Sequence, residues 1–193
     1  MSDKREEIYP PRYTYWYWND VYSIDELKQL HEVFEKNHDK HAIDNPASDA
    51  VKTSKLKMTT WFNLKDKLCH IEQSLLMVNS LHFGLNVWPQ YDTQQIILNE
   101  YDGNIKGEYG WHKDSSDNHV YDIKFTLLIN ASLKPYEGGE FYLFNSKGGE
   151  HVKELNKPGN VIAFISHNYH KVTPVTKGKR HSITMFYTGP RFI

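Results

Sequence analysis

The stretch at residues 161–188, VIAFISHNYHKVTPVTKGKRHSITMFYT, breaks into three short runs that are rich in β-branched and aromatic residues. The runs are Val161–Ile165, Tyr169–Val175 and His181–Thr188. The turn Lys177-Gly178 separates the last two. Runs of this length and composition, bounded by turn residues, are typical of β-strands. The stretch therefore predicts three strands joined by short connections.

Five further runs of the same kind precede this stretch, beginning at residue 94. They are Gln94–Tyr101, Lys106–Asp114, Tyr121–Ala131, Glu140–Phe144 and His151–Leu155. Eight short strands with glycine-containing turns between them predict a β-sandwich or a jelly roll. Strands near the two ends of a jelly-roll pattern lie side by side, so we expect the first runs to neighbour the last.

Two helices and two strands are predicted ahead of this core. Ser23-Ile24-Asp25-Glu26 has the spacing of a capping box, in which serine and glutamate satisfy the first N–H groups of a helix. That helix is expected to end near Asn37, and a second is expected over Lys65–Leu81, where apolar residues recur at steps of three and four. Strands are expected at Tyr13–Tyr22 and Lys55–Phe62. We expect both helices to pack on one sheet.

The length of 193 residues fits one domain, with residues 1–93 as support and residues 94–190 as a jelly-roll core. A chain of this size needs no disulfide, and its single cysteine, Cys69, allows no internal one. The charged start Met1–Glu7 does not resemble a signal peptide, and no run approaches the ~20 apolar residues that span a bilayer. We therefore expect a cytoplasmic protein without a membrane partner. The net charge of −1 argues against nucleic-acid binding over the whole surface.

The motif His112-Lys113-Asp114 lies in one predicted strand, and His170 lies in another near the end of the pattern. Residues two apart on a strand share a face, so His112 and Asp114 point the same way. Two imidazoles and one carboxylate cover one face of an octahedral ferrous ion and leave the other face open. With eleven histidines in the chain, a chance His-x-Asp pair in a surface turn is the plain alternative. His167 is a rival third ligand, but His170 is favoured because it begins a strand-like run.

Arg180 follows His170 by ten positions and leads into the last predicted strand. Its guanidinium stays charged and can bind a carboxylate through two parallel hydrogen bonds. A catalytic zinc ion could use the same three ligands but would not need such an arginine. The three ligands and Arg180 together indicate an iron(II), 2-oxoglutarate-dependent oxygenase. Lys177 and Lys179 are expected to be ordinary surface residues of the preceding turn.

Several motifs in a fixed order are similar to those of one enzyme family. They are Tyr101-Asp-Gly, Tyr109-Gly-Trp-His112-Lys-Asp114, Tyr136-Glu-Gly-Gly-Glu-Phe141, Lys157-Pro-Gly-Asn-Val161 and His170-Lys-Val-Thr-Pro-Val-Thr-Lys-Gly-Lys-Arg180. Over about residues 94–190 the chain resembles the prolyl 4-hydroxylase-like branch of the iron/2-oxoglutarate oxygenases. The resemblance implies a mostly β, double-stranded β-helix (a cupin-like jelly roll) with supporting N-terminal helices. It also implies that His112, Asp114 and His170 hold the catalytic Fe(II).

The cosubstrate contacts follow from the same resemblance. Arg180 would pair with the distal carboxylate of 2-oxoglutarate, where many relatives have a lysine. Tyr101 falls where relatives place a tyrosine that binds the cosubstrate, and Thr184 shares the strand face of Arg180 by even spacing. A further tyrosine of some relatives corresponds to Leu128 here, so that contact is missing or replaced, with Thr126 as the candidate.

The reaction that the resemblance implies is hydroxylation of an unactivated C–H bond by O2, with release of succinate and CO2. Ascorbate is a candidate reductant. A prolyl residue in a peptide or protein is the leading substrate, while a free amino acid, another protein side chain or a small metabolite stays open. Trp111 and Tyr109 are candidates for shaping the substrate side, and residues 38–52 and 115–120 are candidate lids.

Two other functions compete with this one. Asn99-Glu100-Tyr101 ahead of the His-x-Asp pair also resembles the alkylated nucleic-acid demethylases of the same superfamily. Those enzymes have a second arginine six positions after the cosubstrate arginine, where this chain has Phe186. The other competitor is a non-catalytic, cupin-like binding domain. The presence of all three metal ligands together with Arg180 argues against it.

Overall fold

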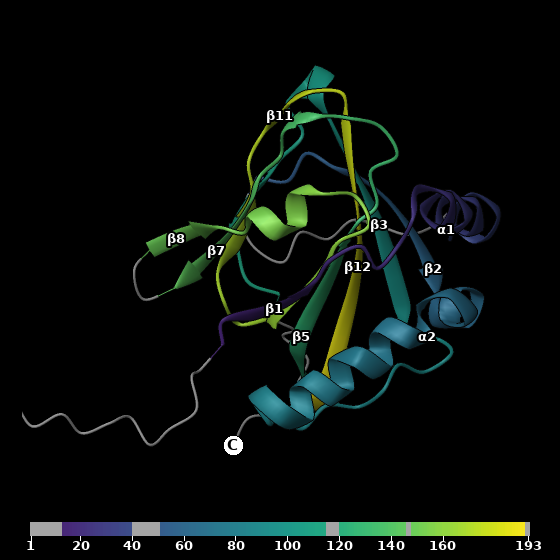
Figure 1. Ribbon diagram of the computed structural model, residues 1–193, viewed down its shortest axis with the longest axis vertical. Coiled ribbons are helices and arrows are strands. Elements are labelled where there is room, and N and C mark those ends of the chain that lie inside the picture. The colour runs from purple at the N-terminus through teal and green to yellow at the C-terminus, as the bar shows by residue number, and fades with distance from the viewer. Residues whose placement is uncertain (1–12, 40–50, 115–119, 146–147, 192–193) are drawn as a thin grey trace, which may run out of the picture.

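The computed structural model describes residues 13–39, 51–114, 120–145 and 148–191, which form a jelly roll backed by two helices (Figure 1). The helices are α1 (Ile24–Asn37) and α2 (Trp61–Val78), and α2 continues into a π-helical turn, η1 (Asn79–Phe83). The 3-10 helices are η2 (Gly103–Ile105) and η3 (Lys153–Asn156). The strands of the described ranges are β1 (Tyr15–Trp18), β2 (Lys55–Thr60), β3 (Gln95–Asp102), β4 (Tyr109–His112), β5 (Tyr121–Asn130), β6 (Glu137–Gly138), β7 (Phe141–Asn145), β8 (Gly148–His151), β9 (Val161–Ile165), β10 (His170–Val172), β11 (Val175–Lys177) and β12 (Lys179–Pro190).

Two antiparallel sheets face each other across the jelly roll. The larger has the strand order β1-β9-β5-β12-β3-β2, the smaller has the order β4-β10-β7-β8, and a two-stranded sheet, β11-β6, lies at one end (Figure 1). The late strand β10 pairs with β4, and the last strand, β12, pairs with β3. Early and late strands of the pattern are therefore neighbours, as expected. The predicted mostly β, double-stranded β-helix with helices in support is confirmed.

Alternation along β12 gives the larger sheet two different faces. Ile183, Met185 and Tyr187 are buried in one cluster with side chains from both helices. The even-numbered residues from Arg180 to Phe186 instead line a cavity between the two sheets. Because successive side chains of a strand point to opposite faces, one sheet both supports the helices and forms a cavity wall.

Both helices cover the outer face of the larger sheet with apolar side chains. These side chains, each almost fully buried, are Leu27, Leu30 and Phe34 of α1 and Leu64, Leu68, Ile71 and Leu75 of α2. Burial of one such side chain stabilises the fold by about 1.5–3 kcal/mol. The prediction that both helices pack on one sheet is confirmed.

The two helices differ in how well the sequence marks their starts. The hydroxyl of Ser23 accepts from the N–H of Glu26 at 3.3 Å, and the Glu26 carboxylate accepts from the N–H of Ser23 at 2.8 Å, so the capping box is present. The helix predicted over Lys65–Leu81 begins earlier, at Trp61. The run Thr59-Thr60-Trp61-Phe62 locally favours a strand, but Trp61 is buried in the helix-facing cluster. Tertiary packing decides the conformation there.

Two of the predicted strands differ in the structure. The run His151–Leu155 is the end of β8 followed by η3, because Val152 and Leu155, three positions apart, are buried together as on one helical turn. The run Tyr169–Val175 is divided into β10 and β11. Pro174 lies at the division, where it has no N–H to donate to a strand ladder.

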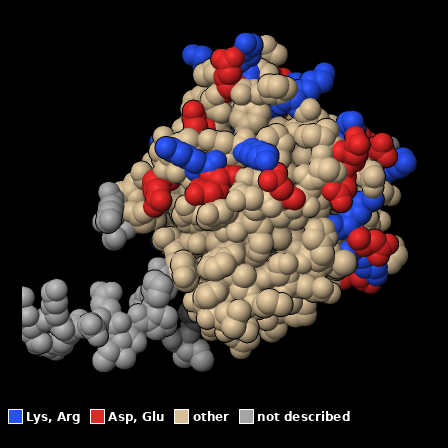
Figure 2. Space-filling view, in the orientation of Figure 1, with Lys and Arg blue, Asp and Glu red and all other residues tan. Residues whose placement is uncertain are grey.

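Charges of both signs are mixed on the surface. On the face that Figure 2 shows, Lys and Arg lie interspersed with Asp and Glu. Two ion pairs of this kind are Lys177–Glu137 and Lys179–Glu100, each at 2.8 Å. Such mixing fits the net charge of −1 and creates no single-sign field on that face. No helix among the described residues is long and apolar enough to cross a membrane.

Candidate metal and cosubstrate site

A cavity of about 330 Å³ lies between the two sheets. Residues of β3, β5 and β12 form one wall, and residues of β4, β7 and β10 form the other. Among the described residues, the charged side chains that line it are those of Lys52, Asp114 and Arg180. The other lining residues are a mixture of apolar and polar side chains, so the charged groups are confined to a few places.

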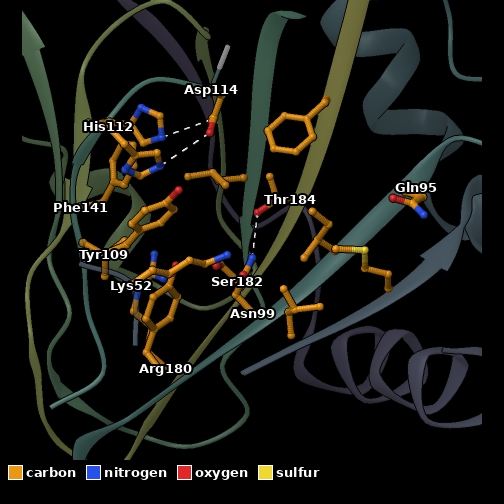
Figure 3. Close-up of a pocket in the computed structure, with 18 of the residues that line it drawn as sticks. Lys52, Gln95, Asn99, Tyr109, His112, Asp114, Phe141, Arg180, Ser182 and Thr184 are labelled. Carbon is orange, nitrogen blue, oxygen red and sulfur yellow. Dashed lines mark hydrogen bonds and ion pairs between the residues drawn. The ribbon is translucent and has the colours of Figure 1, made fainter. Parts of the chain in front are cut away.

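His112, Asp114 and His170 converge in this cavity, and Figure 3 shows His112 and Asp114 at one end of it. His112 ends β4 and His170 begins β10, and the two are direct partners in the strand pairing. Nε2 of His112 lies 3.6 Å from Oδ1 of Asp114, and Nε2 of His170 lies 3.2 Å from Oδ2. The three ligand atoms lie within 4.8 Å of one another and all three residues are buried. The structure therefore brings together the three residues that the sequence singled out.

The two imidazoles are oriented by hydrogen bonds on their far sides. Nδ1 of His112 lies 2.8 Å from the carbonyl of Gly110, and Nδ1 of His170 lies 3.0 Å from the carbonyl of Asn168. A carbonyl only accepts, so Nδ1 of each ring carries a proton, and Nε2 is the ring nitrogen that faces Asp114. Burial and the neighbouring His170 lower the pKa of His112 to about 4, so its ring is neutral at neutral pH. Neutral imidazoles with fixed tautomers are the form that binds a metal ion.

Asp114 is held by Thr126 of β5. Burial alone would raise the pKa of this carboxyl, but His170, His112 and the Thr126 hydroxyl outweigh burial and hold the pKa below its usual range. The Thr126 hydroxyl donates to Oδ2 of Asp114 at 2.7 Å and lies 3.0 Å from the hydroxyl of Ser166. The suggestion that Thr126 replaces a cosubstrate tyrosine is therefore not supported. The cavity wall at that position is the apolar side chain of Leu128.

Tyr109 and Trp111 lie on opposite faces of β4. The Tyr109 ring lines the cavity and stacks on His112, with ring centroids 3.4 Å apart. Trp111 is 38% exposed and packs edge-on against Phe144 on the outer face of the smaller sheet. Trp111 does not line the cavity, whereas Tyr109 does, although both are an odd number of positions from His112. The register of β4 against β10 shifts between Tyr109 and His112, and this shift breaks the simple alternation of side chains. A role on the substrate side stays a prediction for both residues.

Arg180 is the largest fully buried side chain of the described chain, with 1% exposure. It lies opposite Tyr101 in the pairing of β12 with β3, and its guanidinium carbon is 5.3 Å from the centroid of the Tyr101 ring. Its Nη1 has no hydrogen-bond partner among the described residues. A buried cation without a full set of acceptors is costly, and a carboxylate is the group that matches its fork. The distal carboxylate of 2-oxoglutarate therefore fits this end of the cavity.

Gly139 makes room for the arginine. The residue has a φ of 68°, and a Cβ built on it would lie 2.8 Å from Cδ of Arg180 and 2.9 Å from a methyl of Val175. Both the backbone conformation and the lack of space thus require glycine. The Gly-Gly-Glu motif of the sequence has a physical role here, since it lets the Arg180 side chain pass.

Thr184 lies on the same face of β12, as its even spacing from Arg180 predicts. The side-chain amide of Asn99 donates to the Thr184 hydroxyl oxygen at 3.2 Å. Because that oxygen accepts from Asn99, the hydroxyl proton points away from Asn99. It can therefore donate to a carboxylate oxygen of the cosubstrate. Tyr101 also lines the cavity. The residues predicted to contact the cosubstrate are therefore gathered at the Arg180 end.

Other predictions fall outside the cavity or outside the described residues. His167 is exposed in the turn before β10 and is not part of the cluster. The candidate lids at 38–52 and 115–120 lie mostly outside the described residues. Several cavity residues were not singled out from the sequence, among them Ser182, and Lys52 was included only as the last residue of the candidate lid 38–52. Even spacing from Arg180 could have identified Ser182, whereas Lys52 is separated in sequence from every motif.

The chain was compared with known proteins. The family model for the 2OG-Fe(II) oxygenase superfamily matches residues 96–188. A PKHD-type hydroxylase of Synechococcus sp. (strain CC9605) is 40% identical over 76 residues, which are 38% of this chain and 33% of that protein. A PKHD-type hydroxylase of Shewanella oneidensis is 28% identical over 175 residues, covering 86% of this chain and 75% of that protein. The aligned part thus spans only a third of the first relative and three quarters of the second.

Solved structures have the same fold. A Pseudomonas putida prolyl-4-hydroxylase has a TM-score of 0.65 and 17% identity, covering 93% of this chain and 94% of that one. A viral collagen prolyl hydroxylase from Paramecium Bursaria Chlorella virus-1 has a TM-score of 0.62 and 18% identity, with 92% and 97% covered. The matched residues include both histidines, the aspartate and the arginine of the cavity. The family match, these relatives and the shared fold agree that the chain is similar to 2OG-Fe(II) oxygenases of the prolyl 4-hydroxylase-like type.

Proposed function

We propose that the chain is an Fe(II)- and 2-oxoglutarate-dependent dioxygenase that hydroxylates an unactivated C–H bond, with a prolyl residue of a peptide or protein as the leading substrate. One observation carries the proposal. Two imidazoles and a carboxylate meet at one end of a cavity, and a buried guanidinium with an unsatisfied Nη1 lines the same cavity.

His112, Asp114 and His170 would hold the iron. When bound, ferrous iron and 2-oxoglutarate supply the activation of O2 that converts the cosubstrate to succinate and CO2 and oxidises the C–H bond. Ascorbate is proposed as the reductant that keeps the iron ferrous. Because only three protein groups would bind the ion, it could also bind the cosubstrate and O2.

The protein's own contribution is to bind, orient and exclude water. Arg180 binds the distal carboxylate of 2-oxoglutarate, and the Thr184 hydroxyl donates to it. Leu128 and Phe141 give this part of the cavity apolar walls, which strengthen the charge interaction by lowering the local dielectric. The Thr126 hydroxyl donates to Asp114 and holds its carboxylate oriented toward the metal position.

A peptide substrate is supported by a solved structure of the same fold that has a peptide bound. A prolyl hydroxylase of Trichoplax adhaerens, in complex with a hypoxia inducible factor peptide fragment, matches with a TM-score of 0.63 and 17% identity. At 17% identity this likeness shows a shared fold and does not show the substrate. Free amino acids, other protein side chains and small metabolites are therefore the alternative substrates. A nucleic-acid demethylase is disfavoured by Phe186, which lines the cavity where those enzymes have an arginine.

The test measures succinate release from 2-oxoglutarate with Fe(II) and ascorbate, and then screens peptides, amino acids and methylated oligonucleotides for added oxygen by mass spectrometry. We expect uncoupled succinate formation without substrate and a mass gain of one oxygen on a prolyl peptide. Oxidation of an oligonucleotide instead would favour the demethylase. Neither iron binding nor succinate formation would favour a cupin-like binding domain.

Variants separate metal from cosubstrate binding. His112→Ala and Asp114→Ala should abolish iron binding and turnover together. Arg180→Ala should leave iron binding and raise the 2-oxoglutarate KM by about 10- to 100-fold, because a charge-assisted hydrogen-bond pair is lost. Lys177→Ala, which changes an exposed lysine paired with Glu137, is the control. An unchanged KM in Arg180→Ala would show that the assignment of Arg180 is wrong.

A further inference from the structure

Asp114 differs from the two histidines of the metal cluster because it lies outside a strand. β4 ends at His112, whereas His170 begins β10 and is paired directly with His112. The main-chain N–H of Asp114 instead donates to the carbonyl of Ser166 at 3.1 Å. Ser166 lies in the turn that follows β9 and leads to His170. This turn therefore contacts the main chain of one candidate ligand and leads directly into the strand of another.

The main chain of Ser166 is fixed on both sides. Its N–H donates to the carbonyl of Lys124 of β5 at 3.0 Å, and its carbonyl accepts from Asp114. The residue is 0% exposed. Because neither bond involves the side chain, both remain when the hydroxyl is removed. A substitution of Ser166 can thus test the hydroxyl by itself.

The hydroxyl of Ser166 is linked to the Asp114 carboxylate through Thr126. Oγ of Ser166 lies 3.0 Å from Oγ1 of Thr126, and Oγ1 of Thr126 lies 2.7 Å from Oδ2 of Asp114. A carboxylate only accepts, so the single hydroxyl proton of Thr126 is directed to Asp114. The proton between the two hydroxyls then comes from Ser166. The hydrogen bonds run in one direction, from Ser166 to Thr126 to Asp114.

This direction gives the Ser166 hydroxyl a physical effect on a residue that it does not touch. A hydroxyl can rotate, and donation from Ser166 to the Thr126 oxygen leaves the Thr126 proton free to point at Asp114. The same donation polarises the Thr126 O–H and strengthens its bond to the carboxylate. Ser166 and Thr126 are both 0% exposed, so bulk water does not compete for these bonds.

We propose that Ser166 is a positioning residue of the metal site: its hydroxyl orients that of Thr126, which in turn orients the Asp114 carboxylate, and this raises the metal affinity. The inference rests on the proposed function, because it takes Asp114 as a metal ligand. A serine that only packs in the turn would influence the stability of the fold and would have no effect on metal affinity that depends on Thr126.

The experiment measures Mn(II) binding to the metal-free protein, through the electron paramagnetic resonance signal of the free ion. Mn(II) accepts imidazole and carboxylate ligands and is stable in air. Ser166→Ala should weaken binding by about three- to tenfold, as for the loss of one hydrogen bond between neutral groups. Ser166→Thr keeps a hydroxyl and should retain most of the affinity.

Ser132→Ala is the matched control. Ser132 is also 0% exposed, and its hydroxyl oxygen accepts from the N–H of His181 at 3.0 Å, outside the metal cluster. The variant removes a buried serine hydroxyl in the same way and should leave the Mn(II) affinity unchanged. Chemical denaturation of both alanine variants measures how much stability each one loses, so that an effect on the fold is separated from an effect on the metal.

A double-mutant cycle tests whether Ser166 acts through Thr126. In a Thr126→Val background there is no hydroxyl for Ser166 to orient. Adding Ser166→Ala to that background should therefore change the Mn(II) affinity by less than about twofold, because the two residues act as one unit.

Unchanged Mn(II) affinity in Ser166→Ala, or an equal loss in Ser132→Ala, would overturn the proposal. So would a loss from Ser166→Ala that is equally large with and without Thr126→Val. These results would leave the proposed function intact. If the unmodified protein bound neither Mn(II) nor Fe(II), the proposed function would fail together with this inference.

Discussion

The metal ligands are held by hydrogen bonds to the atoms that face away from the metal position. Main-chain carbonyls accept from Nδ1 of His112 and His170, and the Thr126 hydroxyl donates to Asp114. Each bond fixes one ligand's orientation, so that Nε2 of both histidines and the carboxylate of Asp114 face the metal position. Such supporting partners tune metal affinity although they never touch the ion.

Thr126 offers the clearest test of this support. Thr126→Val removes the 2.7 Å hydrogen bond to Asp114 at nearly constant volume. Loss of a supporting hydrogen bond typically weakens metal binding by about 10- to 100-fold, and we expect a loss of this size in an anaerobic Fe(II) titration. Thr126→Ser keeps the hydroxyl and should retain most of the affinity. Unchanged affinity in the valine variant would show that Asp114 needs no such partner.

Glu72 of α2 gives the fold a pH dependence that is separate from the site. Burial raises the pKa of Glu72 above its usual value, although a hydrogen bond from the N–H of Gln90 works in the opposite direction. A raised pKa in the folded state means that the fold prefers the protonated form. This stability is complete below the unfolded-state pKa of about 4.3 and is lost as pH rises through the folded-state pKa.

Glu72→Gln should remove that loss, since glutamine stays neutral and its carbonyl can still accept from Gln90. We expect the variant to have a higher Tm than the unmodified protein at pH 8 and nearly the same Tm near pH 4. Thermal unfolding followed by circular dichroism across this range measures the difference. A difference that is independent of pH would contradict the assignment.

At the scale of elements, the turn between β6 and β7 determines whether Arg180 reaches its place. Gly138 and Gly139 both have a positive φ, and Gly139 lies against the arginine stem. The turn and β12 are far apart in sequence, yet the Arg180 side chain of β12 fits only because Gly139 of the turn has no side chain. The glycine pair is therefore part of the cosubstrate site.

Gly139→Ala should raise the 2-oxoglutarate KM by about tenfold or more, because its Cβ would displace Arg180 from a charge-assisted contact. Gly148→Ala is a matched control, since Gly148 also has a positive φ but a Cβ there meets nothing within 4 Å. Both variants should lose about 1–2 kcal/mol of stability to backbone strain. Equal effects of the two variants on KM would show that the crowding of Arg180 is unimportant.

At the scale of the whole molecule, the two faces of the larger sheet have different roles. One face contributes to the stability of the fold, and the other lines the candidate site. Its outer face packs under the helices and its inner face lines the cavity, so that adjacent residues of β12 serve different purposes. Layered folds of this kind place function on one face of a sheet while the other face supplies the core.

Neighbouring substitutions on β12 should therefore have distinct effects. Ile183→Val removes a buried methyl group and should lower stability by about 0.5–1.5 kcal/mol without changing the 2-oxoglutarate KM. Thr184→Val removes a hydroxyl that faces the cavity and should raise the KM by several-fold with a smaller change in stability. Chemical denaturation and steady-state kinetics on the same preparations test both. A raised KM in Ile183→Val would contradict the separation.

Local sequence determined those features that depend on short-range geometry. The i, i+2 spacing of His112 and Asp114 and the even spacing of Arg180 and Thr184 set which side chains share a face, because a strand alternates. The capping box set the start of α1, because its hydrogen bonds join residues three positions apart. The metal ligands and the arginine were therefore identifiable before any long-range contact was known.

The tertiary structure alone decided which faces meet. The strand tendency of Thr59–Phe62 gave way to a helix at Trp61, and Val152 with Leu155 formed a helical turn, because burial outweighed local preference at both places. Lys52 lines the cavity only because its segment pairs with β4. The physical reason is that spacing fixes directions within one element, whereas contacts between elements depend on strand pairing and packing across long stretches of the chain.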